Sequence, residues 1–271
     1  RRGVTPTRRV QFLVLCCTII VAATVAGVVY ATRQDPVQPK VACHAPARII
    51  PGVRSRNVAA VRAAMTKPTA AAAKALEPLA QADPGDPVVQ YNYAATLYCG
   101  GYFSEATTAF EQAKKAGPDT WYRVQADNLL HPQFFPNGYP PFTYTGHDPL
   151  LVAGQVQQRQ FHQVSAERLW AKAAKEEPSS DVAQVAAAVG RFDMDDLTAS
   201  FSRLGPLVNR FPKSQSVRFH LGLLLAWTGQ RRQAVTEFRK ALALGAGTDL
   251  GKASKAFLNG LVTGGTKSTK R

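Results

Sequence analysis

The chain has 271 residues, a formal net charge of +15, and 45% hydrophobic residues, among which alanine is prominent. This hydrophobic content excludes a disordered chain, and small apolar residues favour close packing of helices over β-sandwiches. The positive charge favours anionic partners such as lipid headgroups, cell-wall polyanions or acidic polypeptides, and fits a basic solubilising surface equally well.

The first hydrophobic segment covers residues 10–31 and contains no charged residue. As a helix it would be about 33 Å long, enough to cross a hydrocarbon core of about 30 Å. Four arginines lie within residues 1–9, and positive charge favours the cytoplasmic side of a membrane. We therefore predict a single-pass protein of the cell membrane, with a cytoplasmic N-terminus and an extracytoplasmic C-terminal domain. The alternative is a cleaved signal peptide that ends at Ala31.

Residues 32–52 contain four prolines and are predicted to form an extended linker. Cys43 lies in this linker, and Cys99 lies in the domain that follows it. In an exported protein both cysteines would face an oxidising compartment, where disulfides persist. A disulfide between Cys43 and Cys99 is one possibility, and two free thiols are the other.

A period of 34 residues organises most of the remaining chain. Pro84 and Pro118 are 34 residues apart, and so are Pro178 and Pro212. The interval from Pro118 to Pro178 exceeds the period by 26 residues, which places an insertion at residues 121–146. The predicted repeat units are 53–86, 87–120, 147–180, 181–214 and 215–248.

Each unit is predicted to form a pair of antiparallel helices. In unit 87–120, apolar residues recur at three- and four-residue steps on both sides of Gly100 and Gly101, which break the helix. Ser104 suits the first turn of the second helix, and Pro118 stops that helix. Since one pair cannot bury its apolar face alone, the copies should stack. The predicted fold class is therefore all-α, a helix-turn-helix repeat solenoid preceded by one transmembrane helix.

Small and aromatic residues recur at fixed places within the units. They are Ala94, Ala106, Phe110, Ala113 and Pro118 in the second unit; Gly154, Ala166, Trp170, Ala173 and Pro178 in the third; and Gly222, Ala234, Phe238 and Ala241 in the fifth. This spacing resembles that of the tetratricopeptide repeat family. Unit 181–214 departs from it at Arg191 and Ser200, and unit 53–86 matches it weakly. The resemblance implies a solenoid that binds protein partners in a groove lined by the first helices.

Candidate groove residues lie on those first helices. They are Tyr91, Tyr98, Leu151, Gln155, Gln158, Phe219 and Leu223. Members of the family that bind a terminal carboxylate place Lys and Asn in the groove, whereas Tyr91 and Ala95 occupy those places here. The resemblance therefore does not imply a carboxylate-binding adaptor. The alternative is that these side chains pack against a capping helix or against the insertion.

The insertion at residues 121–146 combines many aromatic rings with four prolines. Its first ten residues can continue as a short helix, and the rest is predicted to be irregular. Long irregular segments inside compact domains are often functional. The partner-binding candidates here are Trp121, Tyr122, Phe134, Phe135, Tyr139 and Tyr144. Exposed rings would suit a protein partner or the faces of sugars. Alternatively, Phe134, Phe135 and Phe142 fill the seam between two repeat blocks.

The last segments are a predicted capping helix at residues 249–262 and a basic tail at residues 263–271. Catalytic patterns are missing from the sequence. His220 falls within a first helix, and the acidic residues at 193–196 lack the Gly and Glu of a calcium loop. There is no phosphate-binding loop and no hydrolase or metalloprotease motif. We therefore expect no enzyme activity, no metal, no cofactor and no nucleic-acid partner.

The sequence predicts a membrane-anchored scaffold or adaptor that binds a protein partner on the extracytoplasmic face. By architectural analogy, the partner belongs to a membrane complex of the protein-export or cytochrome c maturation type. The alternative is a cell-wall protein that binds polysaccharide through the aromatic insertion and anionic polymer or lipid through its basic surface.

Overall fold

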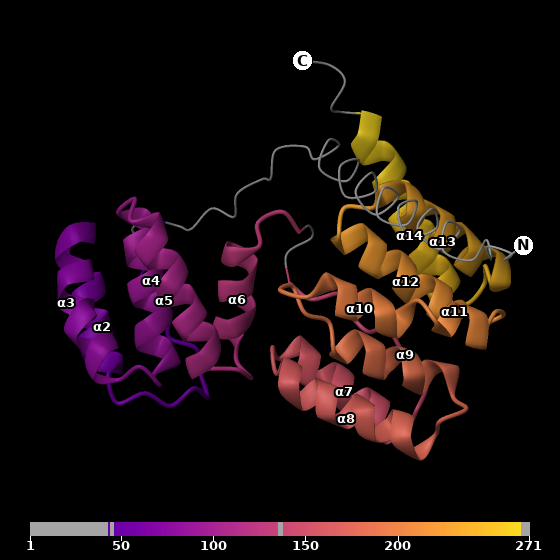
Figure 1. Ribbon diagram of the computed structural model, residues 1–271, viewed down its shortest axis with the longest axis horizontal. Coiled ribbons are helices and arrows are strands. Elements are labelled where there is room, and N and C mark those ends of the chain that lie inside the picture. Colours follow the sequence, from indigo (N-terminus) through magenta and orange to yellow (C-terminus); the bar gives the residue numbers. More distant parts are fainter. Residues whose placement is uncertain (1–42, 44–45, 135–137, 267–271) are drawn as a thin grey trace, which may run out of the picture. The chain divides into compact units, whose positions relative to one another are not determined.

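The computed structural model describes residue 43 and residues 46–134 and 138–266, with side chains described as far as residue 261. Within these ranges the chain is helical and contains no strand (Figure 1). The chain divides into two units, Arg1–Val37 and Gln38–Arg271, and the described residues all belong to the second. The predicted transmembrane segment therefore lies outside the described residues. Among the helices that are described, none is long and apolar enough to cross a membrane.

The helices before the irregular part of the insertion form what we call the N-terminal block. They are α2 (Val58–Met65), α3 (Thr69–Ala82), α4 (Pro87–Cys99), α5 (Phe103–Ala116) and α6 (Trp121–Leu130). The helices after it form the C-terminal block. They are α7 (Pro149–Arg159), α8 (Gln163–Glu176), α9 (Asp181–Gly190), α10 (Leu197–Leu204), α11 (Leu207–Arg210), α12 (Gln215–Trp227), α13 (Arg231–Leu244) and α14 (Asp249–Thr266).

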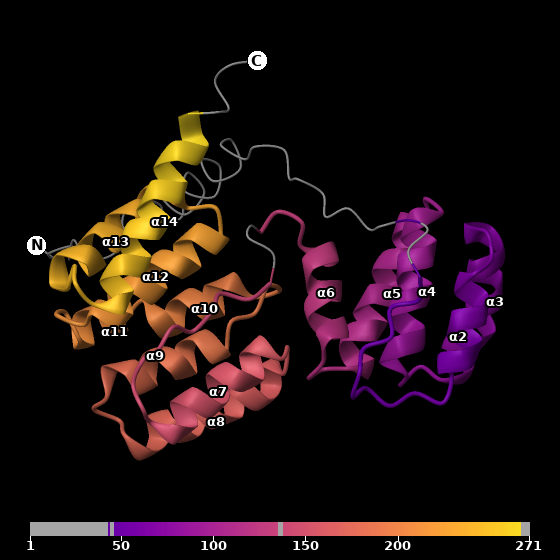
Figure 2. The same cartoon turned by 180° about the vertical axis from the view of Figure 1, so that it is seen from behind.

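Consecutive helices pair as hairpins, as the 34-residue period predicts. The pairs α4–α5, α7–α8 and α12–α13 lie side by side in both views (Figures 1 and 2). Side-chain oxygens cap the first helices, because each accepts a hydrogen bond from a backbone amide in the first turn. The capping residues are Asp86, Asp148, Ser180 and Ser214. The expected all-helical repeat architecture is thus present in the described residues.

The spacing of small and aromatic residues that recurs in the units has a direct packing reason. A Cβ atom added at Gly154 of α7 would lie 2.1 Å from the Trp170 ring nitrogen on α8. One added at Gly190 of α9 would lie 2.9 Å from the same ring. Trp170 therefore fills the space within its own pair as well as the gap to the next pair.

Three segments differ from the predicted boundaries. The helix α14 continues to Thr266, beyond the expected end at residue 262. In the predicted linker, Ala47, Ile49 and Ile50 pack against the apolar core of the N-terminal block, because these side chains are apolar and packing removes them from water. In unit 181–214 the second helix is divided into α10 and α11 around Gly205, where Pro206 removes a backbone donor.

Candidate partner-binding surfaces

Each block holds an extended segment of its own chain against its first helices. In the N-terminal block this segment is residues 46–50. The Asn92 side chain on α4 accepts a hydrogen bond from the backbone N–H of Arg48 at 2.8 Å and donates one to the backbone oxygen of Arg48 at 3.0 Å. The Tyr122 hydroxyl on α6 donates to the same oxygen at 2.8 Å and accepts from the N–H of Ile50 at 3.0 Å. The side chains of Asn92 and Tyr122 therefore provide hydrogen-bond partners for the backbone groups of Arg48 and for the N–H of Ile50.

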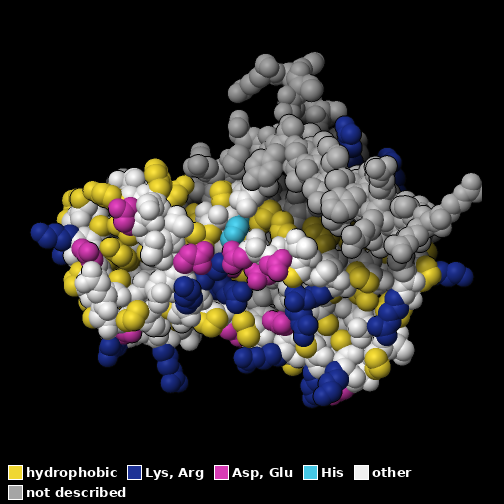
Figure 3. All heavy atoms as spheres, in the orientation of Figure 1, with side chains coloured by type: hydrophobic (Ala, Val, Ile, Leu, Met, Phe, Trp, Pro, Cys, Tyr) yellow, Lys and Arg dark blue, Asp and Glu magenta, His cyan; other side chains and the backbone are white. Residues whose placement is uncertain are grey.

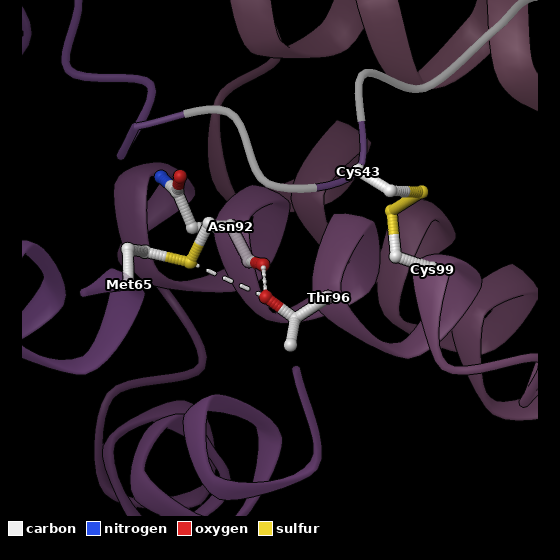
Figure 4. The surroundings of a disulfide bond; sticks show 5 residues. All are labelled: Cys43, Met65, Asn92, Thr96 and Cys99. Atoms are coloured by element: carbon white, nitrogen blue, oxygen red, sulfur yellow. Dashed lines mark hydrogen bonds between the residues drawn. A yellow bond between two sulfur atoms is a disulfide. The ribbon is translucent and has the colours of Figure 1, made fainter. Parts of the chain in front are cut away.

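A disulfide fixes the chain just before residues 46–50. Cys43 is bonded to Cys99 at the end of α4, with Cα atoms 5.4 Å apart, a usual separation for a disulfide (Figure 4). Deeper in the same block, the Thr96 hydroxyl lies between the Asn92 backbone oxygen and the Met65 sulfur of α2 (Figure 4). The start of the domain is thus covalently attached to its second repeat unit.

In the C-terminal block the extended segment is residues 138–144 of the insertion. Gln158 on α7 donates to the oxygen of Pro140 at 3.1 Å and accepts from the N–H of Phe142 at 2.9 Å. Gln155, one turn earlier, donates to the oxygen of Phe142 at 3.0 Å. The Trp227 ring nitrogen on α12 donates to the oxygen of Gly138 at 2.9 Å. The helices therefore bind the backbone of the insertion through side-chain amides and an indole.

Phe142 is the apolar anchor of the inserted segment. Its ring lies 5.1 Å from the Trp170 ring in an edge-to-face arrangement and stacks at 5.1 Å on the His220 ring. The side chain is buried in the core cluster of the C-terminal block. Aromatic pairs at such distances add to the stabilisation from burial. Phe142 therefore lies in the core of the C-terminal block, and not in the seam between the two repeat blocks where the alternative expectation placed it.

His220 serves as a neutral hydrogen-bonding group in this core. Its Nδ1 lies 2.8 Å from the Ser216 backbone oxygen, so this nitrogen carries the proton. Its Nε2 then accepts a hydrogen bond from the N–H of Thr143 at 2.9 Å. Burial lowers the pKa of His220 to about 4. The imidazole thus fixes the insertion segment as an uncharged acceptor.

Charged residues from both blocks meet around Lys114 of α5. Its Nζ lies 2.7 Å from the Asp127 carboxylate on α6 and 2.8 Å from the Asp195 carboxylate between α9 and α10. Asp127 also accepts a hydrogen bond from the Tyr139 hydroxyl, and His131 Nε2 lies 3.0 Å from Asp195. Figure 3 shows acidic side chains gathered beside a histidine and above basic side chains on this face.

The electrostatics of this cluster favour the charged forms of Lys114 and Asp195 and the neutral form of Tyr139. Burial alone would lower the pKa of Lys114, but the hydrogen bonds and negative charges of Asp127 and Asp195 outweigh it and raise that pKa. Partial burial would raise the pKa of Asp195, but Lys114 lowers it. Burial and the neighbouring Asp127 raise the pKa of Tyr139, so the phenol stays protonated and donates. The cluster is an ion-pair network between the blocks.

Most of the predicted groove residues are buried, which corrects the expectation of an open groove. Tyr91 packs edge-on against Phe110 and Trp121 and is buried in the core, which raises its pKa to about 12. Leu151, Phe219 and Leu223 are also buried core residues. Tyr98 is partly buried and its ring lies 5.3 Å from that of Phe103. Gln155 and Gln158 lie on the side of α7 that the insertion covers.

The insertion candidates likewise do not form an exposed aromatic surface. Tyr122 and Phe134 are buried, while Trp121, Tyr139 and Tyr144 are partly buried and pack against the core clusters. Phe135 lies outside the described residues. Tyr139 and Tyr144 belong to residues 138–144, whose backbone is bound by side chains of α7 and α12.

Sequence reasoning missed two residues that bind the main chain of these segments and two residues of the ion-pair network. Asn92, Trp227 and the pair Lys114–Asp127 were not singled out. An Asn on an otherwise apolar first helix and a Lys on the buried side of α5 are signals that could have found two of them, because buried polar side chains need partners.

Comparisons with known proteins give little further information. No family model matches the chain, and no curated protein matches it. Among solved structures, the chain is similar to one described as "MamA RS-1 ArsTM double mutant", with 18% sequence identity, coverage of 72% of this chain and 94% of that chain, and a TM-score of 0.27. A similarity this distant implies nothing about what the chain binds.

Proposed function

We propose that this chain is a non-enzymatic scaffold of the tetratricopeptide-repeat type that binds a protein partner on the outer side of a membrane. Residues 10–31 would anchor it there, with the N-terminus in the cytoplasm. The partner is a subunit of a membrane-associated complex, of the kind that needs an ancillary or assembly factor. The extracytoplasmic face is where the helical domain would meet that partner.

The observation that carries this proposal is the way the first helices bind extended polypeptide. In both blocks, side-chain amides donate to and accept from the same stretch of backbone: Asn92 on Arg48, and Gln155 with Gln158 on Phe142. Amide groups pair with any main chain, since every residue except proline offers one N–H and one C=O. A fold that binds its own segments in this way has surfaces suited to polypeptide ligands.

The disulfide supports the extracytoplasmic location. Cys43 is bonded to Cys99, and structural disulfides persist in oxidising compartments but are rare in the cytosol. Cys43 follows the predicted membrane segment by only a short stretch of chain. A domain fixed by a disulfide so close to the membrane is consistent with export of everything after residue 31.

The polysaccharide alternative has no corresponding support. It required exposed rings in the insertion, and Tyr139 instead donates a hydrogen bond to Asp127 and packs against Phe192. Stacking on sugar needs a free ring face. We therefore propose the protein-binding function alone.

The test is to crosslink the full chain in its native membrane, purify it in detergent, and identify what is covalently attached. We expect one or a few membrane-complex subunits in stoichiometric amount. A parallel reaction with a membrane-impermeant reagent for lysines should label Lys252 in intact cells. Labelling of Lys252 only after lysis would contradict the orientation, and recovery of cell-wall polymer instead of protein would contradict the function.

A further inference from the structure

The first helices of the repeat units share two positions whose surroundings differ between the units. These are the sixth and tenth residues of a unit: Asn92 and Thr96 in α4, Val152 and Val156 in α7, Ala186 and Gly190 in α9, and His220 and Leu224 in α12. The two positions are one helical turn apart and therefore lie on the same side of each helix. The four helices can be compared directly at these places.

In α4, α9 and α12 both positions are buried. The Thr96 hydroxyl contacts the Met65 sulfur of α2, the preceding first helix, at 3.3 Å. Gly190 lies against Trp170 and Glu167 of α8, and Leu224 belongs to the core cluster that includes α9. A preceding helix therefore covers the tenth position in each of these helices. The sixth position contacts an extended segment in two of them, because Asn92 bonds to the backbone of Arg48 and His220 to that of Thr143.

In α7 the same two positions are exposed. Val152 is 37% exposed and Val156 is 39% exposed, and both are among the few exposed large hydrophobic side chains of the described residues. The reason is that α7 follows the irregular part of the insertion and not a helix pair. Of the described helices, α8 is the one with an extensive contact to α7. We call Val152 and Val156 the α7 outer face.

The insertion does not take the place of the missing helix. It bonds to Gln155 and Gln158, which lie on another side of α7. Gly154, which faces Trp170, marks the side covered by α8. The tenth position is thus covered by a helix in each of the other three units, whereas in α7 it presents the exposed Val156, with the exposed Val152 one turn away.

We propose that an amphipathic helix of the protein partner packs on the α7 outer face, in the place that a preceding repeat unit occupies elsewhere in the solenoid. This inference rests on the proposed function and names the surface and the kind of partner segment. A helix is the expected occupant because the fold itself covers the tenth position of α4 with α2 and that of α9 with α8. Stacking against a neighbouring helix is how such a unit buries its apolar surface.

The chemistry of the face defines the partner segment further. The β-branched valines form a low apolar ridge that suits Leu, Ile or Ala at three- and four-residue spacing on the opposing helix. Arg159 is exposed and lies on the same side of α7, one turn beyond Val156. An acidic residue on the partner helix would pair with it, and this adds selectivity more than affinity.

The experiment places a photo-crosslinking amino acid at position 156 of the full, membrane-embedded chain. A matched control carries it at Leu244, which is 42% exposed at the end of α13. We expect position 156, and not position 244, to crosslink to one apolar segment of another protein, at residues spaced by three or four. A synthetic peptide of that segment should gain helical circular dichroism when the purified full chain is added.

Substitution gives the second arm. The double variant Val152→Asp with Val156→Asp should lower the amount of crosslinked and co-purified partner at least about tenfold, while Leu244→Asp should leave it unchanged. Because all three side chains are exposed, circular dichroism should report an intact fold in each variant. Crosslinks from position 156 to a second copy of this chain, to its own residues 1–42, or to nothing would overturn the inference. Partner recovery that is insensitive to the two substitutions would overturn it and leave the proposed function standing.

Discussion

At the scale of single residues, Phe161 stands in a turn position that favours glycine. The fifteenth residue of the repeat unit is Gly101 or Gly229 in two other units, with φ of 82° and 77°. Phe161 has the same kind of backbone, with φ of 66°. A residue with a Cβ atom in this left-handed region carries a steric cost of about 1–2 kcal/mol. The repeat geometry therefore imposes this conformation on a residue that disfavours it.

Phe161→Gly is expected to stabilise the protein by about 0.5–1 kcal/mol. Relief of the steric cost outweighs the larger backbone entropy that glycine has in the unfolded chain. Denaturant unfolding followed by circular dichroism measures the difference. Gly229→Ala is the matched control and should destabilise by about 1 kcal/mol, since a Cβ there meets no atom within 4 Å and only the backbone is affected. A loss of stability in Phe161→Gly would contradict the strain argument.

His220 makes the stability depend on pH. Its pKa is lowered to about 4 in the folded state, compared with about 6.5 when unfolded. The unfolded chain therefore binds the proton first as the pH falls, so stability decreases from about pH 6.5 down to pH 4. Between pH 7 and pH 5 this group should remove about 2 kcal/mol. Unfolding curves at the two pH values measure it, and His220→Gln should lack that part of the decrease. An equal decrease in both proteins would show that other groups cause it.

At the scale of elements, the sequence predicts the helices that recur with the 34-residue period, and it does not predict where the non-repeating insertion packs. Gly154 and Trp170 each stand at a fixed place of the repeat unit, and they contact one another in the structure. The helical hairpins can therefore be predicted from the spacing alone. The position of residues 138–144 depends on hydrogen bonds from Gln155, Gln158 and His220 to a segment without a repeat. Such contacts join residues far apart in the chain, and local periodicity carries no signal for them. The sequence offered the insertion as one of the alternatives for what packs on the first helices, but it could not place residues 138–144 on particular side chains.

Phe142→Ala tests whether the insertion is an integral part of the C-terminal block. The ring is buried against Trp170 and His220, so its removal should cost about 3–5 kcal/mol. Phe103→Ala is the matched control, because Phe103 is 60% exposed and its removal should change stability by less than about 1 kcal/mol. Thermal and denaturant unfolding report both values. A cost below about 1 kcal/mol for Phe142→Ala would mean that the segment leaves the core easily.

At the scale of the whole described domain, the apolar residues form three clusters, and polar contacts join the blocks that contain them. Asp119, at the end of the N-terminal block's second unit, accepts hydrogen bonds from the backbone N–H groups of Val164 and Ser165 at the start of α8. Lys114 binds Asp127 within its own block and Asp195 in the other. An interruption of the repeat would otherwise separate two solenoid fragments, and these contacts hold them together.

Lys114→Met should destabilise the protein by about 3–5 kcal/mol. The substitution leaves the buried Asp127 carboxylate without its closest cation, at 2.7 Å, and a buried charge that loses its partner is costly. Lys115→Met, at the exposed neighbouring position, should stay within about 0.5 kcal/mol of the native protein.

The double variant Lys114→Met with Asp127→Asn should lose less stability than the sum of the two single variants, because the second change removes the charge that the first one leaves unpaired. Denaturant unfolding of the four proteins gives the coupling directly. If the stability changes of the two single variants add up within about 0.5 kcal/mol, Lys114 stabilises the contact between the blocks through its aliphatic chain and not through the ion pair.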